Sequence, residues 1–122
     1  MTKVPRTTPL RLREMSIDDD SLQQRYKDVI DALTRYLTDA VHIADPRMRE
    51  DFERDGVVLR AKIPSEQEVR LFVSHEFLSD FSATRAANAM REWRIGDKVR
   101  TLPRGMTLFL TTEGTFTERT SV

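Results

Sequence analysis

The segment from residue 82 to residue 112 constrains the fold of this chain more than any other. Ser82–Trp93 places its apolar residues at helical spacing behind a serine, and serine is a good helix N-cap. Gly96 is typical of the end of such a helix. Two runs that could form strands, Lys98–Leu102 and Met106–Thr112, then flank the turn sequence Pro103–Gly105. We therefore predict a short helix followed by a β-hairpin.

The predicted helix and hairpin are both basic. Arg85, Asn88 and Arg91 fall on the polar side of the helix, and arginine and asparagine are the side chains that hydrogen-bond guanine and adenine. Basic residues on a hairpin could reach phosphates or the minor groove. The alternative is a solvated basic helix beside an ordinary hairpin. The residues we expect to contact nucleic acid are Arg85, Asn88, Arg91, Arg94, Lys98, Arg100 and Arg104.

The charges are distributed unevenly although their total is zero. Residues 1–13 carry a net charge of +4, residues 14–55 carry −6, and residues 82–104 carry +4. A domain polarised in this way can present a positive face to a polyanion. A mixed, solvated surface remains an alternative explanation of the same pattern.

A long amphipathic helix is predicted near the N-terminus. Apolar residues from Leu22 to Val41 follow the 3.6-residue period, and a helix of this length spans roughly 33 Å. That is long for a domain of this size, so part of the stripe could pack against a second copy instead of this chain's own core. We expect a homodimer, with the contact made by Leu22, Tyr26, Val29, Leu33 and Leu37.

The middle of the chain gives mixed signals. Met48–Arg54 reads as a short charged helical turn, and Val57–Ile63 alternates as a strand does. Residues 65–78 fit either a helix or a strand. As a helix they would bury Val69, Phe72, Val73 and Phe77, which we favour. As a strand they would follow a hairpin loop at residues 64–67, and a short apolar run cannot decide between the two.

Three stretches resemble the GntR family of winged-helix transcriptional regulators. Ile63–Glu68 is similar to the sequence that opens that family's second helix. Phe81–Trp93 resembles its recognition helix, and Val99–Thr107 resembles its wing. The spacing differs from the family's pattern, because Ser82 lies 18 residues after Pro64. The resemblance implies a winged-helix fold and DNA binding.

The sequence offers little for catalysis. It has no cysteine, and its two histidines, His42 and His75, lack the spacing of a zinc-binding pair. The glycines are scattered at expected turns, so no phosphate-binding loop is formed. We expect no catalytic residues, no metal and no cofactor.

These observations predict one α+β domain that is winged-helix-like, with a long N-terminal amphipathic helix and a C-terminal β-hairpin. Residues 1–15 would be a flexible basic arm, 16–114 the domain and 115–122 a tail. We expect a cytoplasmic, dimeric protein that binds double-stranded DNA in a sequence-specific manner and regulates transcription as a repressor. No apolar run is long enough for a membrane span. The alternative is a small inhibitor or adapter, of phage or plasmid type, that binds another protein.

Overall fold

The computed structural model describes residues 20–120, with side chains from residue 26 onward, so the expected basic arm at residues 1–15 lies outside the described residues. The chain is an α+β domain, as the sequence predicts. Its elements are, in order, α1 (Asp20–Val41), β1 (Ala44–Asp51), β2 (Gly56–Lys62), β3 (Glu68–Ser74), α2 (His75–Asp80), α3 (Ala83–Glu92), α4 (Ile95–Arg100), β4 (Met106–Thr111) and β5 (Gly114–Arg119).

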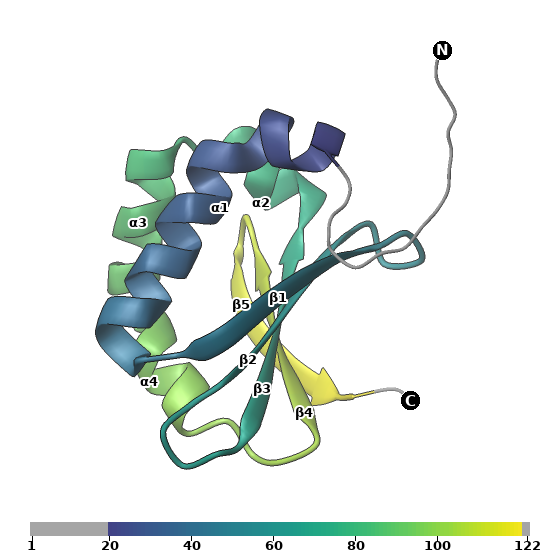
Figure 1. The fold of residues 1–122 in the computed structure, drawn as a ribbon. Coiled ribbons are helices and arrows are strands. Elements are labelled where there is room, and N and C mark those ends of the chain that lie inside the picture. The colour runs from purple at the N-terminus through teal and green to yellow at the C-terminus, as the bar shows by residue number, and fades with distance from the viewer. Residues whose placement is uncertain (1–19, 121–122) are drawn as a thin grey trace.

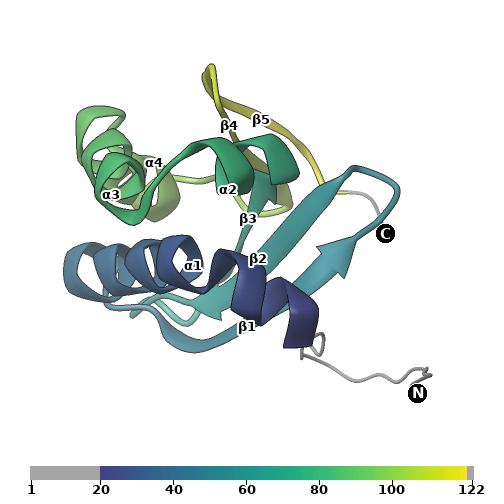
Figure 2. The same cartoon turned by 90° about the horizontal axis from the view of Figure 1, so that it is seen from above.

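The strands form one five-stranded sheet in the order β1-β2-β3-β4-β5. All neighbouring strands are antiparallel except β3 and β4, which are parallel because α2, α3 and α4 connect them. The helices lie together on one face of this twisted sheet (Figures 1 and 2). None of the helices between residues 20 and 120 combines the length and the apolar character that crossing a bilayer requires.

The core lies between the sheet and the helices. Alternate residues of the inner strands, such as Val57, Val73 and Leu108, face the helices and are almost fully buried. On the helical side, α1 contributes Leu33 and Leu37, which are 0% and 2% exposed. Lys27 on the outer side of α1 pairs with Asp31 at 2.7 Å, and this hydrogen bond and its charge raise the pKa of the lysine.

The expected dimer contacts of α1 are largely part of this core. Val29, Leu33 and Leu37 are buried within the chain, so they present no surface to a second copy. Tyr26 is half-buried and interrupts the helical geometry (φ −117°, ψ 15°), and the side chain of Leu22 lies outside the described residues. The apolar stripe of α1 packs within its own chain, because the sheet and α3 both contact it.

Two predictions for the middle of the chain are corrected. The charged segment Met48–Arg54 forms the second half of β1 and the start of the following turn instead of a helical turn, because the buried Met48 pairs with Leu59 of β2. Within residues 65–78, β3 (Glu68–Ser74) takes the place of most of the favoured helix, and helical structure begins only at His75 in α2. Residues 63–67 make the preceding hairpin turn, in which the Glu66 N–H donates to the Ile63 carbonyl at 2.8 Å.

The predicted hairpin around Pro103–Gly105 is wrong. Lys98 and Arg100 belong to the helix α4, whose residues Ile95 and Val99 are buried beneath α1 and α3. The C-terminal hairpin is instead β4–β5, and it includes most of the segment expected to be a tail, residues 115–122. A β-hairpin does lie toward the C-terminus, at β4–β5, but its turn at Thr112 and Glu113 contains no basic residue.

The face of the sheet opposite the helices carries an aromatic row, Phe72, Phe109 and Phe116, on three successive strands. Phe109 lies with its ring centroid 4.9 Å from that of each of the other two. Arg54, from the β1–β2 turn, covers the Phe109 ring at 5.1 Å and pairs with Glu118 at 3.3 Å. Phe72 and Phe109 are therefore buried, whereas Phe116 at the edge is 47% exposed.

Candidate nucleic-acid interface

The start of helix α3 agrees with the prediction from the sequence. The Ser82 side chain caps it by accepting a hydrogen bond from the Arg85 N–H at 3.1 Å. Ala86, Ala89 and Met90 are buried, and the helix packs along α1. These contacts fix which side of α3 faces solvent.

The end of α3 differs from the prediction, because Gly96 does not terminate it. Trp93 caps α3, and Arg94 then takes a left-handed backbone conformation (φ 55°, ψ 47°) from which α4 starts. Gly96 lies inside α4, where a Cβ atom would come within 3.1 Å of the Tyr36 hydroxyl and 3.2 Å of the Ala40 Cβ. The glycine therefore allows α4 to approach α1 closely.

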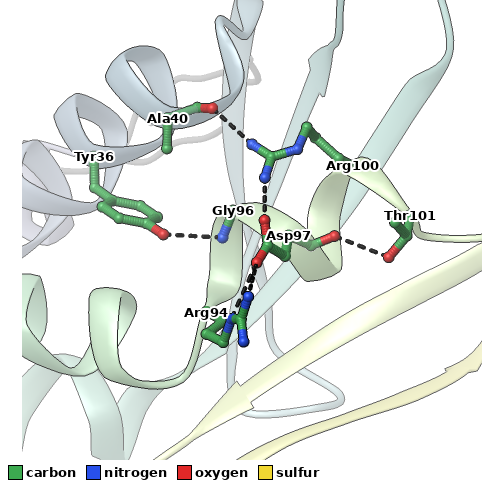
Figure 3. A network of polar contacts seen from close by, with 7 residues as sticks. All are labelled: Tyr36, Ala40, Arg94, Gly96, Asp97, Arg100 and Thr101. Carbon is green, nitrogen blue, oxygen red and sulfur yellow. Dashed lines mark hydrogen bonds and ion pairs between the residues drawn. The ribbon is translucent and has the colours of Figure 1, made fainter.

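A polar network joins α4 to α1 at this approach (Figure 3). The Tyr36 hydroxyl accepts a hydrogen bond from the Gly96 N–H at 3.0 Å, which satisfies one of the unpaired donors at the start of α4. Asp97 accepts hydrogen bonds from both Arg94 and Arg100. Arg100 also donates to the Ala40 carbonyl at 2.8 Å, near the C-terminal end of α1 where cations are favoured.

The network borders an open depression of about 210 Å³. Its lining residues are Tyr36, Ala40, Arg91, Arg94, Gly96, Asp97 and Arg100. Three arginines and one aspartate thus line the depression, and two of the arginines, Arg94 and Arg100, pair with Asp97. Residues 83–100, which span α3 and α4, carry five basic side chains and two carboxylates, those of Glu92 and Asp97, so this segment has a net charge of +3.

The other expected contact residues divide into two groups. Arg85 and Asn88 are exposed on α3, the helix that also carries Arg91. The Arg85 guanidinium lies 4.3 Å above the Phe81 ring, and Asn88 accepts a hydrogen bond from Arg91. Lys98 instead reaches toward the sheet, where its ammonium group donates to the Thr115 hydroxyl at 2.9 Å.

The remaining expected contact, Arg104, is exposed in the loop between α4 and β4. It has no hydrogen bond or ion pair to another described residue, and it takes no part in the network around Asp97. The structure therefore brings together Arg91, Arg94 and Arg100, with Arg85 and Asn88 farther along α3.

Sequence reasoning missed the contribution of α1 to this surface. Tyr36 lies 60 residues before Gly96, so nothing in the local sequence connects them. The i,i+3 spacing of Arg94, Asp97 and Arg100 is visible in the sequence and is the one signal that could have identified the cluster.

His75 belongs to a separate cluster at the start of α2. Its Nδ1 lies 2.8 Å from Asp55 and its Nε2 lies 3.0 Å from Glu50, while its ring stacks on Tyr26. The His75 N–H also donates to the Asp55 carbonyl at 3.0 Å. His75 therefore links α2 to the β1–β2 hairpin, and these contacts give it a structural role.

Comparison with family models, curated protein sequences and solved structures yields no match for this chain. The resemblance to GntR regulators accordingly stays a prediction.

Proposed function

We propose that this protein binds double-stranded DNA through α3 and α4 and acts in transcriptional regulation. The observation that carries the proposal is the convergence of Arg91, Arg94 and Arg100 around one open depression beside the exposed face of α3. Positive charge gathered on one face supports binding to a polyanion even when the total charge is zero.

Phosphate contact is the role that suits the arginines beside Asp97. Arg94 is 76% exposed at its side chain, and its carboxylate partner holds the guanidinium near the edge of the depression. Arg100 is held by hydrogen bonds to the Ala40 carbonyl and to Asp97. It therefore contributes a positive charge at a fixed position and is not free to extend toward a phosphate. Such contacts position a duplex but carry no sequence information.

Base reading is the role we assign to Arg85 and Asn88. Stacking on Phe81 occupies the flat face of the Arg85 guanidinium and leaves its N–H groups available in the plane. That planar arrangement suits bidentate contact with guanine. Helix α3 would then enter the major groove without a basic wing, because the residues expected to form the wing are helical or lie in a loop.

Fluorescence anisotropy with labelled duplexes tests the proposal. Arg91→Ala and Arg94→Ala should each weaken binding to all duplexes and lower the slope of log Kd against log salt by about one unit. Arg85→Ala should instead relax preference at one position of a site selected from random duplexes, at a cost of about 1–3 kcal/mol.

Arg47→Ala is the matched control. It removes the same charge from an exposed side chain on β1, on the sheet face that no described helix covers. Binding should be nearly unchanged. Equal losses for Arg47→Ala and Arg94→Ala, or no salt-dependent binding by the unmodified protein, would contradict the proposal.

A further inference from the structure

We infer that two copies of this chain pair through β5, antiparallel and about a two-fold axis, so that Phe116 of one copy meets Phe116 of the other. This pairing does not depend on DNA binding. It places the contact between the two copies at β5 instead of at α1. It follows from the two edges of the sheet, the direction of the backbone groups on β5, and the register that its side chains favour.

The two edges of the sheet differ in how they are protected. On β1, Pro46 has no N–H, Asp45 takes a left-handed conformation (φ 52°), and a bulge follows Ala44. These features block the addition of another strand. The edge at β5 has no such device: it pairs regularly with β4 from Arg119 to Gly114, and no described strand covers its outer side.

The outward backbone groups of β5 follow from its pairing with β4. The Thr120 N–H donates to the Gly105 carbonyl at 2.7 Å, so residue 120 points toward β4. Directions alternate along a strand, and residues 118 and 116 therefore also point toward β4. Thr115, Thr117 and Arg119 direct their N–H and C=O groups outward, where they are available to a second strand.

Symmetry and charge select the register. Residues that lie opposite one another in an antiparallel pair have their side chains on the same face of the sheet. The two-fold axis must therefore pass through a residue of β5 and not between two residues. With Phe116 there, Thr115 of each copy lies opposite Thr117 of the other, and the two residues can exchange both backbone hydrogen bonds. Glu113 then comes beside Arg119 of the second copy. Neither side chain has an ion pair within the described chain.

Neighbouring registers are less favourable. Placing Thr117 on the axis sets Phe116 against Glu118, whose carboxylate already pairs with Arg54. Placing Glu118 on the axis brings two like charges together. The Phe116 register instead joins the two aromatic rows, covering the ring that is 47% exposed and already stacked on Phe109.

Single cysteines test the axis directly, because the 122-residue chain contains none. The Cα atoms of a non-hydrogen-bonded antiparallel pair lie about 4.5 Å apart, within the range that a disulfide spans. Phe116→Cys should therefore give a disulfide-linked dimer rapidly under mild oxidation. Glu118→Cys and Thr117→Cys are controls at positions that are also exposed, and they should link slowly. Equal or faster linking of either control would overturn the inference.

A charge exchange provides the second test without altering Phe116. In sedimentation equilibrium of the full chain, Glu113→Arg and Arg119→Glu should each raise the dimer dissociation constant several-fold, because each places like charges together twice. The double variant should restore the original value. A monomeric mass for the unmodified protein at high micromolar concentration, or no restoration in the double variant, would overturn the inference. Neither readout involves DNA.

Discussion

At the scale of single residues, Asp97 determines how much of the arginine charge is available. Its carboxylate accepts hydrogen bonds from Arg94 and Arg100, and Arg100 in turn holds the Ala40 carbonyl. The same residue therefore stabilises the junction of α1 with α4 and lowers the positive potential of the surface. If the surface binds DNA as proposed, stability and anion binding are opposed at this position.

Asp97→Asn separates these two roles. The amide keeps the shape of the side chain but removes its charge, so we expect the free energy of unfolding to fall by about 1 kcal/mol in urea titrations. Affinity for duplex DNA should rise, since two guanidinium groups lose their carboxylate partner. If stability falls while affinity stays constant or drops, these arginines do not contact the phosphates.

At the scale of elements, α1 is a core helix that also positions the candidate site. One side of it buries Leu33 and Leu37, while Tyr36 and Ala40 reach α4. The orientation of the arginine surface therefore depends on the packing of α1 against α3. Damage to that packing should loosen the whole domain.

Leu33→Ala tests the assignment of α1 to the core. The side chain is 0% exposed, so its truncation should lower the free energy of unfolding by about 2–5 kcal/mol. The folded fraction should keep the oligomeric mass of the unmodified protein, measured by light scattering. A change of oligomeric mass with little loss of stability would instead indicate that Leu33 lies at an interface between copies. Thr38→Ala, on the exposed side of α1, serves as the control.

At the scale of the whole molecule, burial and strand pairing are concentrated in the central strands. β3 is paired on both sides and covered by α2, whereas α4 has six residues and is partly exposed. Segments with fewer buried contacts open at lower free energy. The candidate DNA surface is thus built partly on the less stable side of the domain.

Hydrogen exchange measures this distribution. Amides of Leu71 and Val73 in β3 should exchange only through global unfolding, and those of α4 should exchange faster by local opening. Dimer formation at β5 should add protection at Thr115 and Thr117 as the protein concentration rises, because their N–H groups point outward. Uniform protection across β3 and α4 would show that the domain opens as one unit.

Features that depend on local periodicity could be predicted from the amino-acid sequence. The apolar spacing and serine cap predicted α3, the alternation after Gly56 predicted β2, and together they gave the α+β class. The exposed positions of Arg85, Asn88 and Arg91 followed from the same helical period. Neighbouring residues carry these signals, so no tertiary contact was needed to predict them.

Elements whose local sequence fits both helix and strand depend on long-range packing for their structure. Residues 68–74 became a strand because two neighbouring strands pair with them, and residues 95–100 became a helix because their apolar residues face α1 and α3. The network around Asp97 joins residues 60 positions apart. Short apolar runs fit more than one period, and long-range packing supplies the energy that selects between them.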